Sequence, residues 1–199
     1  MSAVTIRYFT DPACPPDPAR MRLCWLYGDR IAWELCMIVL RVHRGPGWPQ
    51  ARSSDATVHA CRAVVGTRLR WPDRQEAMLR QLQMLSAAGE PLDDSDTLEI
   101  AAERAALPVA GLAAYCAEPE VEAALRADIE ASAGRACATQ EVRGDLGGLE
   151  RRDEPGSIEE VLAWAGMPLS AAEVEVVCGS DLSAEQAGAA RLADGYWSL

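Results

Sequence analysis

The chain contains no lysine, so all 19 of its Lys and Arg residues are arginine, and 30 acidic residues outnumber them. The net charge of −11 disfavours nucleic acid as a partner, because binding to phosphates requires clustered positive charge. The sequence also lacks an apolar run long enough to span a bilayer and an N-terminal pattern typical of a signal peptide. We therefore expect a cytoplasmic protein that has no membrane partner.

A Cys-x-x-Cys pair is missing as well, although the chain has 7 cysteines. Their odd number and irregular spacing disfavour a zinc ribbon, and we predict neither a metal site nor a cofactor. In a cytoplasmic protein we expect most of these thiols to be reduced.

The hydrophobic share of 49% is sufficient for a packed core, and 199 residues fit one domain with an insertion or an appendage. Periodicity and breakers predict an α/β order of elements. These elements are a strand at 4–9, a helix at 19–27, a strand at 31–42, a helical region, a strand at 136–142, a hairpin partner at 149–152, and a helix from 157 to 165. The predicted segments are 1–52 and 135–166 for the α/β core, 53–134 for the helical insert, and 167–199 for an appendage.

Local signals place some of the helix starts. Asp96 and Glu99 have the spacing of a capping box, and Pro108 and Pro119 each stand where a first-turn proline belongs. Ser157 with Glu160 predicts the cap of the closing core helix.

The appendage is predicted to hold two helices, 171–178 and 183–193, of which Ser170 caps the first. Two such helices are typical of helix-turn-helix fragments. Arg191 is the only basic residue of the appendage, so a packing or dimerisation role is favoured over DNA binding. A homodimer is left open.

Cys14 lies between the first strand and the first helix, where a helix N-terminus can stabilise a thiolate. Asp17 occupies the place that a second cysteine of a Cys-x-x-Cys pair would take. Pro16 and Pro18 disfavour helix in the residues before them, and Pro18 has no N–H to donate. We therefore expect Asp17 to be the N-cap and Pro18 the first helical residue. Because Cys14 then lies before the helix, we expect its pKa to be lowered less than the pKa of a thiol at a helix start.

With this junction and the order of elements, the chain resembles the DsbA-like thioredoxin-fold proteins, specifically their cytoplasmic, actinobacterial-type members. The resemblance covers roughly residues 4–165. It is carried by three stretches, which are Tyr8–Pro15, Leu92–Asp128 of the helical insert and Thr139–Gly144. It implies a thioredoxin-like core with an inserted helical domain and a thiol–disulfide oxidoreductase ancestry.

The resemblance also identifies departures from the family. Its motif is usually Cys-Pro-Trp-Cys or Cys-Pro-Trp-Ser, and here the matching residues are Cys14-Pro15-Pro16-Asp17. The family's cis-proline corresponds to Ala138, for which we expect a trans bond, because a cis bond without proline costs about 3 kcal/mol. By resemblance, Pro15, Ala138 and Thr139 border the substrate.

Cys137 matches the residue that faces the active cysteine across the family's site. Cys14 and Cys137 could therefore form a disulfide or share a metal with a third ligand. Alternatively, Cys137 is a small packing residue, as Cys24 and Cys36 are expected to be.

Three functions remain open. The first is a DsbA-like thiol–disulfide oxidoreductase with a degraded, monothiol site and weak or specialised activity. Cys14 is its nucleophile, Asp17 a nearby charge, and a thiol-containing protein or small molecule its partner. The second is a non-catalytic binding or adaptor module on the same fold, and the third is a thiol-dependent isomerase or transferase of small molecules.

Overall fold

The computed structural model describes residues 4–39, 53–179, 190–191 and 196–198. The chain divides into two compact units. The first unit comprises Met1–Arg7, Pro16–Glu34 and Gln140–Leu199, and the second comprises Tyr8–Pro15 and Leu35–Thr139. The C-terminal third of the chain is therefore in the same unit as its first helix.

Three strands form the main sheet in the order β2-β1-β3, and β1 is the central strand. They are β1 (Val4–Thr10), β2 (Ile31–Met37) and β3 (Thr139–Arg143). The predicted second strand is longer than the observed one, because Ile38 and Val39 lie beyond its end, and residues 40–42 are outside the described part. The last residues of β1 lead directly into the turn that holds Cys14.

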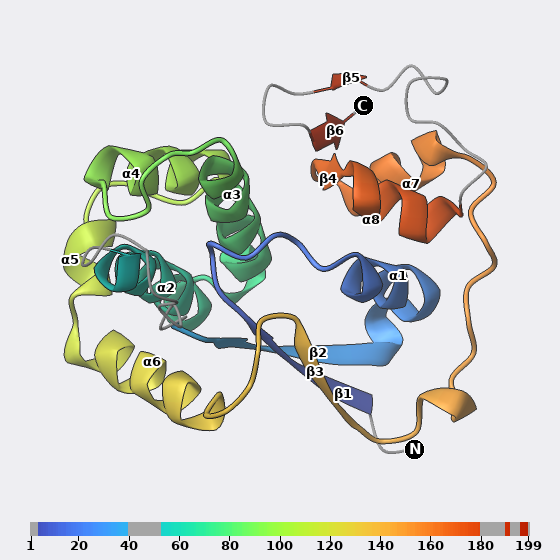
Figure 1. Cartoon of the computed structure of the whole chain (residues 1–199), viewed down its shortest axis with the longest axis horizontal. Coiled ribbons are helices and arrows are strands. Elements are labelled where there is room, and N and C mark those ends of the chain that lie inside the picture. Colours follow the sequence, from blue (N-terminus) through green and yellow to red (C-terminus); the bar gives the residue numbers. More distant parts are fainter. Residues whose placement is uncertain (1–3, 40–52, 180–189, 192–195, 199) are drawn as a thin grey trace, which may run out of the picture. The chain divides into compact units, whose positions relative to one another are not determined.

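The first unit contains α1 (Pro18–Tyr27), α7 (Ile158–Ala165) and α8 (Ala171–Cys178), and Figure 1 shows α8 beside α1. Trp25 of α1 is buried among apolar residues of α7 and α8, and its ring meets the edge of Trp164 at 5.1 Å between centroids. Ser157 caps α7 by accepting a hydrogen bond from the Glu160 N–H, as its sequence predicts.

The second unit contains the helical insert, whose helices run from teal through green to yellow in Figure 1. Its helices are α2 (Ser53–Arg70), α3 (Gln75–Ala87), α4 (Ser95–Arg104), α5 (Leu112–Cys116) and α6 (Pro119–Ala131). α2 packs against α3, α5 and α6, so it is the central helix of the insert. Met78 and Leu82, four residues apart on α3, are fully buried because they form one apolar stripe.

A paired carboxylate anchors the insert to the end of β2. Asp128 of α6 accepts two hydrogen bonds from the Arg68 guanidinium, at 2.9 and 3.2 Å, and one from the Met37 N–H at 2.9 Å. Arg68 also donates to the Leu35 carbonyl. These bonds join α2 and α6 to the end of the strand. Removing either partner of the ion pair would leave the other charge without its counter-charge, which is costly at a largely buried position.

The predicted hairpin partner at 149–152 is wrong, because these residues form no strand. After β3 the chain makes a short 3-10 turn, Leu146–Gly148, capped by the Asp145 carboxylate. The Arg152 N–H then donates to the Leu26 carbonyl near the end of α1. The backbone of this segment therefore pairs with a helix end and not with a strand.

Of the two helices predicted for the appendage, the structure confirms the first and contradicts the second. Its first helix, α8, forms with the predicted Ser170 cap, and Glu173 completes a capping box. The predicted second helix is wrong where it can be seen, because Ala190–Arg191 is strand β5. Its residues 183–189 and 192–193 lie outside the described part. β5 and β4 (Leu169–Ser170) pair antiparallel with β6 (Tyr196–Ser198). The described part of the appendage therefore contains one helix and a small sheet, where two helices are predicted.

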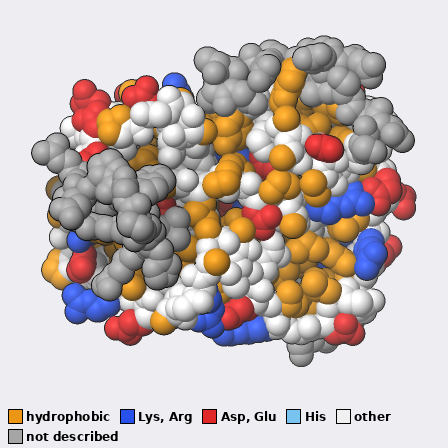
Figure 2. Space-filling model, viewed as in Figure 1, with side chains coloured by type: hydrophobic (Ala, Val, Ile, Leu, Met, Phe, Trp, Pro, Cys, Tyr) orange, Lys and Arg blue, Asp and Glu red, His pale blue; other side chains and the backbone are white. Residues whose placement is uncertain are grey.

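Two further features bear on partners. Within the described ranges, no helix is both long and apolar enough to cross a membrane. On the face drawn in Figure 2, arginine and acidic side chains are interspersed among apolar and neutral ones.

Candidate functional site: the Cys14–Cys137 disulfide

Cys14 lies in a tight turn that follows β1. The Asp11 carboxylate accepts a hydrogen bond from the Ala13 N–H at 2.7 Å, and the Asp11 carbonyl accepts one from the Cys14 N–H at 2.8 Å. An aspartate that bonds the backbone two residues ahead forms an Asx turn. Cys14 is only 5% exposed, whereas Ala13 and Pro15 on either side of it are exposed.

The predicted helix start is confirmed. Asp17 is the N-cap of α1, its side chain accepts a hydrogen bond from the Ala19 N–H at 3.0 Å, and Pro18 is the first helical residue. The second carboxylate oxygen of Asp17 accepts from the Gln140 side chain at 2.7 Å. Asp17 is therefore a structural cap with both oxygens in use.

Cys137 lies just before β3, between the exposed residues Ala136 and Ala138. It packs against the cluster of Phe9, Cys36 and Ile38, and its sulfur is 3.9 Å from the Thr10 hydroxyl. The Cys137 residue is half-buried, in contrast to buried Cys14.

Ala138 has a strained backbone. Its N–H donates to the Phe9 carbonyl at 2.9 Å, which fixes the segment to β1, and its φ of 63° lies in the left-handed region. That region costs a residue with a Cβ about 1–2 kcal/mol. The described residues include no cis peptide bond, so the expected trans bond at Ala138 is observed. Thr139 stabilises the turn, because its hydroxyl donates to the Ala136 carbonyl at 2.7 Å.

The structure brings Cys14 and Cys137 together as a disulfide. Their Cα atoms are 6.7 Å apart, within the usual range for a disulfide, although 123 positions separate them in the sequence. Among the alternatives that the sequence left open, the pair is therefore a disulfide here. Because a bonded sulfur does not titrate, the thiol pKa of Cys14 stays a prediction.

A third sulfur lies behind the Cys14 turn. The Cys61 thiol of α2 donates toward the Asp11 carboxylate at 3.9 Å and the Ile38 carbonyl at 3.7 Å. Burial raises the pKa of Cys61 well above its ordinary value, and the negative charge of Asp11 raises it further. Cys61 is therefore an inert, protonated thiol that supports the turn.

Of the residues expected to border the substrate, Ala138 and Thr139 lie beside Cys137, and Pro15 follows Cys14. Sequence reasoning missed Asp11, although an aspartate followed by proline is a recognisable turn signal. It also missed Cys61 and Gln140, whose roles depend on contacts between distant segments. Among the described residues, no three His, Cys, Asp or Glu side chains are grouped so that they could hold a metal ion.

Comparisons with known proteins bear on the fold. No protein-family model matches the chain, and no curated protein matches its sequence. Among solved structures, the chain is similar to a candidate protein disulfide isomerase from Nitrosomonas europaea. The two share 13% identity at a TM-score of 0.55, over 77% of this chain and 90% of the other.

At that identity the likeness bears on the fold alone, and it agrees with the order of elements described above. A sheet with β1 at its centre carries the cysteine turn, and the described residues between β2 and β3 form the five helices α2 to α6. The chain therefore has an α/β, thioredoxin-like fold with an inserted helical domain.

Proposed function

We propose that this protein is a thiol–disulfide oxidoreductase in which Cys14 and Cys137 form the redox-active pair. The observation that carries the proposal is their disulfide, which joins the turn after β1 to the segment just before β3. A second cysteine from the opposite segment replaces the missing partner at Asp17. The proposal extends the monothiol prediction, because the pair supplies an intramolecular route for clearing a mixed disulfide.

The exchange has two steps. A thiolate of a dithiol substrate attacks the Cys137 sulfur, the bond to Cys14 breaks, and Cys14 leaves with the electron pair and takes up a proton. The second substrate thiolate then attacks the substrate sulfur of the mixed disulfide and releases Cys137. The substrate is oxidised to a disulfide and the pair is reduced to two thiols, which a second disulfide compound reoxidises.

Exposure favours Cys137 as the sulfur that is attacked. Access to the sulfur controls the rate of exchange, and Cys14 is 5% exposed whereas Cys137 is half-buried. Cys14 is then the leaving group in the oxidising direction. In the reverse reaction, Cys14 is the nucleophile that clears a mixed disulfide from Cys137.

The test is oxidation of a dithiol peptide by the oxidised protein, with Cys14→Ser, Cys137→Ser and the control Cys178→Ser. Cys178 is a half-buried free cysteine at the end of α8. We expect both site variants to fall to the buffer rate and Cys178→Ser to match wild type. Full activity in Cys137→Ser would contradict the paired mechanism, and equal rates in all four proteins would favour a binding module.

A trapping experiment tests which sulfur is attacked. We expect Cys14→Ser to accumulate a mixed disulfide on Cys137 with a thiol peptide activated as a disulfide. In Cys137→Ser, the buried Cys14 should react with the same activated peptide more slowly. The opposite order of rates would show that Cys14 is the point of entry.

A further inference from the structure

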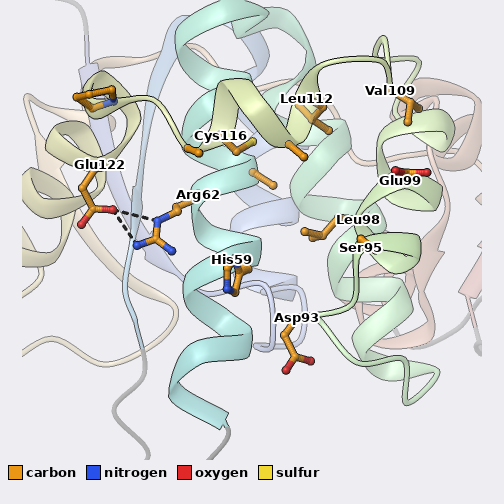
Figure 3. Close-up of a pocket in the computed structure, with 14 residues that line it drawn as sticks. His59, Arg62, Asp93, Ser95, Leu98, Glu99, Val109, Leu112, Cys116 and Glu122 are labelled. Atoms are coloured by element: carbon orange, nitrogen blue, oxygen red, sulfur yellow. Dashed lines mark hydrogen bonds and ion pairs between the residues drawn. The ribbon is translucent and has the colours of Figure 1, made fainter.

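A second site lies within the helical insert and uses neither cysteine of the disulfide. It is a pocket of about 780 Å³ formed by α2, α4, α5 and the start of α6, together with the loops before α4 and α5. Figure 3 shows Arg62 and Glu122 on one side of the pocket and Leu98 and Glu99 on the other. A volume of this size is typical of pockets that enclose small organic molecules.

The interior of the pocket is mainly apolar. Leu98, Val109 and Leu112 line it together with alanine side chains of α2 and α5. Cys116 also lines it, and burial raises the pKa of this thiol to about 11. At neutral pH Cys116 is therefore a protonated, weakly polar group, and the pocket offers an apolar surface without a reactive thiolate.

The charges around the pocket are unbalanced. Its single guanidinium, Arg62, is paired with Glu122 through contacts of 2.9 and 3.0 Å, so its charge is already balanced by a carboxylate. Asp93 and Glu99 also line the pocket, and neither has an ion-pair or hydrogen-bond partner among the described residues. The two unpaired carboxylates leave the rim negative.

We propose that this pocket binds a small amphipathic organic cation, with an apolar body against Leu98 and Leu112 and an amine near Glu99 or Asp93. An anionic ligand of the same shape would meet these two carboxylates, and among the described lining residues only His59 and Arg62, which is already paired, can carry a positive charge. The proposal is independent of the redox function, because its residues form no part of the disulfide site.

The test is isothermal titration of the full chain with three compounds that share one apolar body: phenylbutylamine, phenylbutyrate and phenylbutanol. We expect one saturable site with affinity in the order amine, alcohol, acid. Glu99→Gln should weaken amine binding by about two- to fivefold, the usual range for an exposed charge pair, without changing alcohol binding. Ala113→Trp, which fills the pocket, should abolish saturable binding of the amine.

The matched control is Glu103→Gln, which removes the same charge from an exposed position one turn further along α4 and does not line the pocket. It should bind the amine as wild type does. Equal losses in Glu99→Gln and Glu103→Gln would show a general attraction to an acidic chain and would overturn the proposal. So would phenylbutyrate binding as tightly as the amine. If Ala113→Trp does not fold, Leu98→Trp takes its place, and unchanged amine binding in a folded filling variant would also overturn it.

Discussion

The two cysteines of the disulfide lie in segments of different character. The Cys14 turn is buried and is fixed by the Asp11 side chain and carbonyl. The Cys137 segment is flanked by exposed alanines, carries backbone strain at Ala138, and is attached to β1 through one backbone hydrogen bond. In the redox function that we propose, this difference makes Cys137 the more accessible sulfur and leaves Cys14 in the buried turn.

The largest expected change in stability comes from reducing the disulfide that joins the two segments. The disulfide spans 123 positions, and reduction should lower the free energy of unfolding by about 4 kcal/mol, because a long loop regains entropy in the unfolded state. Urea unfolding of wild type with and without dithiothreitol measures this difference. The Cys14→Ser/Cys137→Ser double variant is the control and should not respond to the reductant. An unchanged midpoint for reduced wild type would contradict the stabilising role.

The next largest change in stability is expected at Ala138, which corresponds to the cis-proline of the DsbA-like proteins that the sequence resembles. Ala138→Pro should destabilise the protein by about 3 kcal/mol, because proline cannot adopt a φ of 63° and lacks the N–H that bonds to Phe9. Thermal unfolding measures the loss. A variant as stable as wild type would indicate that this segment can change its conformation to accept the proline.

Removing the side chain that fixes the Cys14 turn should lower the stability by a smaller amount. Asp11→Ala removes the acceptor for the Ala13 N–H and for the Cys61 thiol, and should destabilise the protein by about 2 kcal/mol. Asp17→Ala is the comparison, since it removes the N-cap of α1 and the acceptor for the Gln140 side chain, both part-exposed, and should cost about 1 kcal/mol. Equal losses in urea unfolding would argue against a special role for the Asp11 turn.

The smallest effect is a gain. Ala138→Gly should stabilise the protein by about 1 kcal/mol, because glycine adopts a positive φ without steric strain. Ala136→Gly, two residues earlier and without a positive φ, should be neutral or destabilising. If calorimetry gives the same melting temperature for Ala138→Gly and wild type, the strain assigned to Ala138 is absent.

Features set by neighbouring residues could be predicted from the sequence. Proline sterics alone placed the start of α1 at Pro18 with Asp17 as its cap, and the cap at Ser170 followed from local side-chain chemistry. Two similar signals failed. The capping pattern at Asp96 is wrong because α4 starts at Ser95, and Pro108 follows the end of a helix.

Features that depend on distant contacts could not be predicted in the same way. The local pattern predicts a strand over 149–152, and nothing in these residues shows that the Arg152 N–H bonds to the end of α1. Cys14 and Cys137 were matched only through a family resemblance, with the pairing left open. The positive φ of Ala138 also depends on a distant bond, from its N–H to Phe9 on β1.

The most direct test of the account is mass spectrometry of the oxidised protein, alkylated and digested without reduction. The account predicts a peptide linked through Cys14 and Cys137, which is lost after incubation with a dithiol peptide as that peptide becomes oxidised. The other five cysteines should carry the alkyl label in the denatured protein. Alkylation of both Cys14 and Cys137 in the oxidised protein, or a linked peptide that persists while the dithiol is oxidised, would contradict it.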